Sequence, residues 1–199
     1  MYLIKVSVHM RDAYRLLADC QKMHQFVTSL FDTDRSTSQV LYRTKADGEF
    51  LHIYIYANRP ADTSRCKHKI EQKEITAWLN AMETGQYLGF DLVASPCKKV
   101  SDGGKNSKRK ILRTEQERQA WLSKKAEASG FTIVQATEQS AISTAGKHPS
   151  ENGGKMHHNA YHYQGVLHIT NAELFRRAIQ DGIGPGKAYG FGMMMVKPL

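Results

Sequence analysis

The chain has few cysteines and no long apolar stretch. Its 199 residues include three cysteines, Cys20, Cys66 and Cys97, which lie far apart, are odd in number and form no C-x-x-C pair. This pattern argues against a disulfide framework and against a zinc knuckle. The start, MYLIKVSVHMRD, alternates in polarity instead of forming the apolar region of a signal peptide, and no apolar run approaches about 18 residues. We therefore expect a cytoplasmic protein with no membrane partner.

Recognised cofactor and metal patterns are also missing. The stretch GIGPGKAYGFG holds five glycines, Gly182, Gly184, Gly186, Gly190 and Gly192, but their spacing fits neither a dinucleotide fingerprint nor a P-loop. His158 and His162 are four residues apart in an expected strand, about 13 Å from each other, which is too far for one ion. We expect neither a cofactor nor a metal, and we interpret the glycine-rich stretch as an anion-binding or tight-packing loop.

The pattern of expected strands and helices occurs twice along the chain. In the first half, alternation predicts a strand over residues 2–9, and Asp19 caps a helix with an apolar stripe at Met23, Phe26, Val27 and Leu30. Strands are expected at 40–45 and 49–57, joined through Asp47 and Gly48, followed by a short helical segment after Pro60 and an edge strand at 69–75.

The second half repeats this order more clearly. Strands are expected at 89–95, 131–136, 160–169 and 191–196. Capping boxes beginning at Thr114 and Thr170 predict helices that end at Gly130 and Gly182. Residues 139–158, rich in Ser, Gly, Lys and His, are expected to form a loop. The sequence thus predicts an α+β protein with two tandem ferredoxin-like (βαββαβ, RRM-like) domains, residues 1–84 and 85–199.

Positive charge is concentrated between Cys97 and Arg113. Lys and Arg total 28 against 19 for Asp and Glu, a formal net charge of +9. A hairpin bent at Asp102-Gly103-Gly104 would project a basic finger able to follow a phosphate backbone, although a solvated mobile loop is the alternative. The candidate RNA-binding cations of this segment are Lys98, Lys99, Lys105, Lys108, Arg109, Lys110 and Arg113.

Two further groups carry alternative interpretations. The stretch with Lys147, His148, Lys155, His157 and His158 is either a second contact arm, with Lys155 as a candidate RNA ligand, or disordered. Tyr54 and Tyr56 lie on a strand that resembles an RRM platform, but the flanking glycines of that motif are missing, so ordinary strand tyrosines are the alternative to base stacking.

His24 is the best-placed candidate for proton transfer. On a helical wheel it lies about 110° from the centre of the apolar stripe, at the rim of the buried face, where it could meet a substrate. A structural role for a histidine in such a position is the alternative.

Several phrases together resemble one family. They are MYLIKV, QKMHQFV, FDLVASPCKK, QERQAWLSKKAEASGF, YQGVLHI and above all GIGPGKAYGFG. The chain is similar from end to end to CasE, the CRISPR RNA-processing endoribonuclease of the Cascade complex, in the RAMP superfamily. The resemblance implies metal-independent cleavage at the 3′ base of the CRISPR-repeat hairpin. His24 would be the catalytic residue, the 2′-hydroxyl would attack the adjacent phosphate, and the products would carry a 2′,3′-cyclic phosphate and a 5′-hydroxyl.

The same resemblance assigns further residues and exposes departures. It implies that Lys98 to Arg113 contact the RNA stem, and that Lys187, in a glycine-rich loop packed between the domains, contacts a phosphate. Gln21 stands where family members commonly have tyrosine, and Ser29 stands where they have a cation or histidine. Both are candidates for active-site support, and Ser95 replaces an asparagine.

Three hypotheses for function follow. The first is an endoribonuclease, monomeric when free, that retains its product and joins other Cascade subunits on the precursor and mature guide RNA. The second is an RNA-hairpin-binding subunit with weak or no catalysis, which the loss of tyrosine at Gln21 favours. The third is a phosphate-binding metabolic enzyme with a ferredoxin-like fold.

Overall fold

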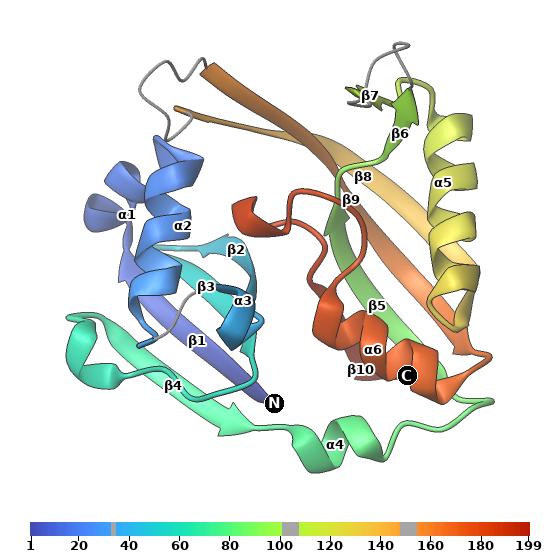
Figure 1. Ribbon diagram of the computed structural model, residues 1–199, viewed down its shortest axis with the longest axis horizontal. Coiled ribbons are helices and arrows are strands. Elements are labelled where there is room, and N and C mark those ends of the chain that lie inside the picture. Colours follow the sequence, from blue (N-terminus) through green and yellow to red (C-terminus); the bar gives the residue numbers. More distant parts are fainter. Residues whose placement is uncertain (33–34, 101–107, 148–154) are drawn as a thin grey trace.

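The computed structural model describes residues 1–32, 35–100, 108–147 and 155–199, and contains two four-stranded antiparallel sheets. Their strand orders are β2-β3-β1-β4 and β10-β5-β9-β8. In each sheet the fourth strand of a β-α-β-β-α-β unit lies beside the first, and the third lies on the other side of the first. Figure 1 shows the two units next to each other, with the chain after α6 running between them. The predicted tandem ferredoxin-like fold is confirmed.

The first sheet is built from residues 2–74. Its strands are β1 (Tyr2–His9), β2 (Leu41–Asp47), β3 (Phe50–Ala57) and β4 (Lys69–Glu74). The helical segments of this part are α1 (Met10–Leu17), α2 (Cys20–Ser29), α3 (Arg35–Ser38) and the single 3₁₀ turn η1 (Thr63–Arg65). Alternation in β1 buries Ile4, Val6 and Val8 against Met23 and Val27 of α2, as the two sequence periods predict.

The second sheet is built from residues 87–198. Its strands are β5 (Tyr87–Ala94), β8 (Phe131–Lys147), β9 (Lys155–Ile169) and β10 (Met194–Pro198). The helical segments are α4 (Thr76–Asn80), which precedes the sheet, α5 (Glu115–Ala128), α6 (Ala172–Asp181) and the 3₁₀ turn η2 (Lys187–Tyr189). A two-stranded hairpin, β6 (Cys97–Val100) with β7 (Lys108–Ile111), is inserted between β5 and α5.

Four details differ from the sequence predictions. The helix α1 was not expected, because Ala13 is the only buried residue that it provides. The predicted helix after Pro60 is reduced to the turn η1. The cap of α6 is Asn171, whose side chain accepts from the Leu174 amide at 3.0 Å, instead of Thr170. Residues 139–147 and 155–158 belong to the long β8–β9 ladder instead of a loop, while 148–154 fall outside the described residues.

Buried side chains connect the two units. Leu41 and Tyr56 of the first sheet lie in the same apolar cluster as Leu92 and Met194 of the second. Leu79 of α4 joins this cluster as well. Within the described residues, no helix is both long enough and apolar enough to cross a membrane.

Candidate active site

The helix α2 places His24 at the edge of the first unit. Asp19 caps this helix by accepting from the Gln21 amide at 2.9 Å, and Met23 and Val27 anchor its buried face. His24 is half-buried between that face and solvent. Its ring lies 6.4 Å from the ring of Tyr189, centroid to centroid, at an interplanar angle of 65°. A residue of the second unit therefore completes the surroundings of His24.

The two supporting residues predicted from the sequence are placed differently on α2. Gln21 is half-buried and lies one turn before His24, on the same side of the helix. Ser29 is exposed and follows His24 by five residues, which rotates it by about 140° around the helix. Its hydroxyl donates to the Phe26 carbonyl at 2.8 Å. The structure thus brings Gln21, but not Ser29, to the side of His24.

The glycine-rich loop holds Tyr189 in place. All five of its glycines have positive φ, between 74° and 87°, a region that other residues rarely adopt. Gly186 and Gly190 flank η2, and a Cβ atom at Gly190 would lie 3.1 Å from the Tyr42 ring. The Tyr42 hydroxyl donates to the Ala188 carbonyl at 3.1 Å. Bare backbone at these positions therefore lets η2 dock against β2 of the first unit.

A second imidazole contacts the same phenol. His158 of β9 stacks on Tyr189 with ring centroids 4.3 Å apart and an interplanar angle of 23°. Burial, together with the neighbouring His157, lowers the pKa of His158. Burial, reinforced by Cys20, raises the pKa of Tyr189, so this phenol stays protonated at neutral pH. Tyr189 has no role in the sequence prediction, because it lies 165 positions after His24 and no local pattern signals the contact.

A polar pocket of about 610 Å³ opens beside these rings. Lys99 and Arg109, directly opposite each other in the β6–β7 ladder, contribute its cations. Its other lining residues are Ser95, Cys97, Ile111, His157, His158, Asn159, Pro185, Gly186 and Tyr189. The pocket combines positive charge with titratable side chains, which is an arrangement suited to a phosphodiester.

The other predicted cations that the structure describes do not line this pocket. Lys98 and Lys110 form the adjacent cross-strand pair and therefore point to the other face of the hairpin. The Lys98 ammonium lies 3.7 Å from the Glu117 carboxylate of α5. Arg113 is exposed between β7 and α5, and Lys187 is half-buried in η2.

Three predicted RNA ligands can be placed only in part. Lys105 lies outside the described residues. Lys108 and Lys155 are located by their backbones, opposite Val100 and Lys147 in their respective ladders. Among the described residues, no group of three His, Cys, Asp or Glu side chains is arranged to hold a metal ion.

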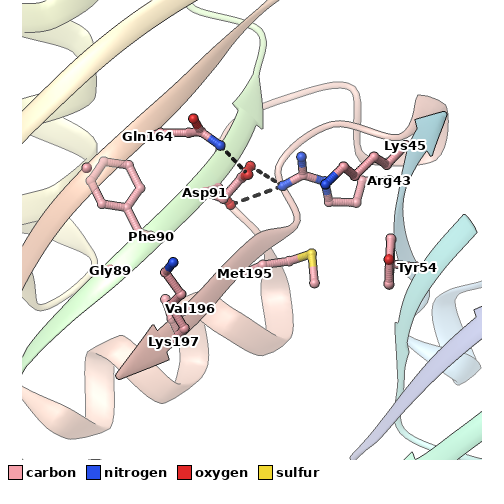
Figure 2. Close-up of a pocket in the computed structure, with 11 residues that line it drawn as sticks. Arg43, Lys45, Tyr54, Gly89, Phe90, Asp91, Gln164, Met195, Val196 and Lys197 are labelled. Carbon is pink, nitrogen blue, oxygen red and sulfur yellow. Dashed lines mark hydrogen bonds and ion pairs between the residues drawn. The ribbon is translucent and has the colours of Figure 1, made fainter. Parts of the chain in front are cut away.

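A separate cleft of about 450 Å³ lies between the two sheets, and neither His24 nor any of the predicted RNA-binding cations lines it (Figure 2). The buried Arg43 of β2 donates to the carboxylate of Asp91 in β5, and to the Asp91 carbonyl at 3.3 Å. Gln164 and His162 of β9 also contact the Asp91 carboxylate, each at 2.8 Å. This network clamps the two units together.

The strand tyrosines of the RRM-like prediction lie at this side of the molecule. Tyr54 lines the cleft, whereas Tyr56 is buried, and burial raises its pKa to about 12. Base stacking on Tyr56 is therefore wrong, because its ring lies in the core that the two units share.

Comparisons with known proteins identify the family. A family model described as "CRISPR associated protein" matches residues 1–198. The CRISPR-associated endoribonuclease Cse3 of Thermus thermophilus is 32% identical over 127 residues, 59% of each chain. The CRISPR system Cascade subunit CasE of Escherichia coli is 27% identical over 100% of each chain. A solved structure of Thermus thermophilus Cse3, bound to an RNA representing a pre-cleavage complex, shares the fold with a TM-score of 0.86 and 24% identity, over 99% of this chain and 98% of that one. The resemblance found in the sequence is thus confirmed, and the chain belongs to the family of CRISPR-associated proteins that includes Cse3 and CasE.

Proposed function

We propose that this chain is a metal-independent endoribonuclease that binds the hairpin of CRISPR repeat RNA and cleaves precursor CRISPR RNA at the 3′ base of the stem. The observation that carries the proposal is the contact of the His24 ring with Tyr189, which itself lines a pocket that contains Lys99 and Arg109. The curated relatives, an endoribonuclease and a Cascade subunit, support the same activity.

The chemistry uses proton transfer and fixed positive charge. The ribose 2′-hydroxyl attacks the adjacent phosphorus, the bond to the 5′ oxygen breaks, and the products carry a 2′,3′-cyclic phosphate and a 5′-hydroxyl. An imidazole such as His24 can take the hydroxyl proton or give one to the leaving oxygen. Lys99, Arg109 and Lys187 would stabilise the negative charge of the phosphorane.

Binding of the stem explains why the product stays bound. Cleavage at the base of a hairpin leaves the stem contacts of the β6–β7 hairpin in place, so turnover is close to single. The retained complex would join the other Cascade subunits on the mature guide RNA, in the cytoplasm, with the free protein a monomer. Residues 1–84 would form the domain that supplies His24, and residues 85–199 the domain that supplies the basic hairpin and the glycine-rich loop.

Cleavage of the cognate repeat RNA in EDTA tests the proposal. We expect cutting of the all-ribose RNA and none when the scissile nucleotide is 2′-deoxy. The variant His24→Ala should abolish cleavage and leave RNA affinity nearly unchanged. The matched control is His68→Ala, because His68 packs on Phe26 of the same helix and lies outside the pocket. Cleavage blocked by EDTA, or equal cleavage by His24→Ala and the parent, would contradict the mechanism.

The second candidate is an RNA-hairpin-binding subunit without catalysis. Gln21 favours it, since the amide beside His24 cannot act as an acid or a base. Intact RNA in both arms of the assay, with a retained gel shift, would establish this role instead.

A further inference from the structure

The reaction proposed above requires two proton transfers. As the 2′ oxygen bonds to phosphorus, its proton must be accepted, and as the phosphorus–5′ oxygen bond breaks, that oxygen must receive a proton. No electrons are exchanged with an outside group. Gln21 cannot transfer protons, the Ser29 hydroxyl donates within its own helix, and burial raises the pKa of the Cys20 thiol, so His24 is the one proton-transfer group that these residues of α2 supply. A second group has to come from elsewhere in the fold.

We propose that His158 is the second catalytic imidazole of this site, and that it accepts the 2′-hydroxyl proton while His24 donates to the 5′ oxygen. His158 reaches the site from β9, in the second unit. Its ring stacks on the Tyr189 ring with centroids 4.3 Å apart, and the centroid of the His24 ring lies 6.4 Å from that of the same Tyr189 ring. The two imidazoles therefore share one aromatic neighbour, Tyr189, which together with His158 lines the polar pocket. This inference rests on the proposed function and extends it to a residue that replaces the missing proton acceptor.

The hydrogen bonding of His158 supports a role in binding substrate. Its Nε2 atom is buried and has no hydrogen-bond partner among the described residues. Buried polar nitrogens usually have a hydrogen-bond partner, because a nitrogen that is buried without one loses the hydrogen bond that it would make to water. A ribose hydroxyl entering the pocket would supply that partner.

The charge around His158 favours a neutral imidazole, which is the form that a general base needs. The titratable and charged groups near it are His157 on its own strand, Tyr189 and Lys187 on η2, His24 and Cys20 on α2, and Cys97, Lys99 and Arg109 on the hairpin. Burial and the adjacent His157 keep the His158 pKa below its ordinary 6.5. His158 is thus available as a base at neutral pH.

The same strand offers a matched control. His168, ten residues further along β9, stacks on Tyr87 with centroids 4.5 Å apart and an interplanar angle of 26°. The substitutions His158→Phe and His168→Phe each keep an aromatic ring in a similar stack and remove a titratable group. They therefore separate proton transfer from packing.

Single-turnover cleavage at saturating protein, measured across pH together with RNA affinity and melting temperature, tests the inference. We expect His158→Phe to slow cleavage by at least about 100-fold, with affinity and melting temperature unchanged. We also expect it to remove the rise in rate with pH that the parent shows on the acidic side. His168→Phe should behave like the parent in every measurement.

Failures of the two proposals have different signatures. If the parent itself leaves the RNA intact, the proposed function fails. If the parent and His158→Phe cleave equally well with the same pH profile, while His24→Ala does not cleave, only the role of His158 is overturned. A slower His158→Phe that keeps the pH profile of the parent would also overturn it, because the histidine would then act through packing.

Discussion

The strongest quantitative prediction concerns the two faces of the β6–β7 hairpin. Lys99 and Arg109 form one cross-strand pair and line the pocket, whereas Lys98 and Lys110 form the next pair and point away from it. If the pocket face grips the RNA backbone, neutralising its cations with Lys99→Ala and Arg109→Ala should remove two phosphate contacts. The double variant Lys98→Ala and Lys110→Ala is the matched control, with the same strands and the same change in net charge.

The magnitude follows from counterion release. Each phosphate contact adds about 0.7–0.9 to the slope of log affinity against log salt concentration, so loss of two contacts lowers the slope by about 1.4–1.8. Between about 50 and 200 mM salt, the affinity of the pocket-face variant should therefore fall about tenfold less than that of the parent. Affinity for the repeat hairpin, measured by filter binding at several salt concentrations, gives these slopes directly.

Two outcomes would refute the reasoning. A pocket-face variant with the slope of the parent would show that Lys99 and Arg109 do not contact phosphates. An equal decrease of the salt slope in both double variants would show that the slope depends on net charge and not on which face of the hairpin carries the cations. The second outcome would indicate that Lys98 and Lys110 also contact the RNA, as the sequence predicts for the whole segment from Lys98 to Arg113.

Three further predictions concern stability. Gly190→Ala should destabilise the fold by about 1–2 kcal/mol in urea unfolding, because alanine is strained at the observed φ of 87° and its Cβ would press on Tyr42. Arg118→Met should lower the free energy of unfolding by about 3–5 kcal/mol, because it leaves the buried Glu138 carboxylate without the guanidinium that binds it. Adding Glu138→Leu should recover most of this loss. For Asp91, burial acts to raise the pKa, but hydrogen bonds and a neighbouring guanidinium outweigh it and hold the pKa below the ordinary 3.8. The resulting stability is complete above that value and is lost as the pH falls through the lower folded-state pKa, so unfolding measured from about pH 5 to pH 2 should show a shallower decline for Asp91→Asn than for the parent.

Local patterns determined much of the fold. The alternation in β1, the Asp19 cap of α2 and the Thr114 capping box of α5 each act over a few residues, and each is found where it was expected. The long β8–β9 ladder was missed because residues 139–158 carry loop-like Ser, Gly, Lys and His. Pairing between β8 and β9, which no local composition encodes, makes residues 139–147 and 155–158 extended.

The candidate site divides in the same way. His24 could be found because its position relative to an apolar stripe is a property of one helix. Tyr189 and His158 could not, since their contacts with His24 and with each other depend on how β9 and η2 meet α2. The basic hairpin was predicted as a whole, whereas its division into two faces required the register of β6 and β7.

The junction of the two units explains why the terminal loop needs so much glycine. His24 comes from the first unit and His158 from the second, so their spacing depends on how firmly the units are held together. Tyr189 lies between them on a 3₁₀ turn whose flanking glycines adopt left-handed backbone and whose Ala188 carbonyl accepts from the Tyr42 hydroxyl. A residue with a side chain in place of Gly190 would separate η2 from β2 and move the Tyr189 phenol away from His24. The glycines therefore affect the proposed reaction by setting the distances of His24 and His158 from Tyr189. A phosphate that reaches the pocket then meets side chains that both units have already positioned.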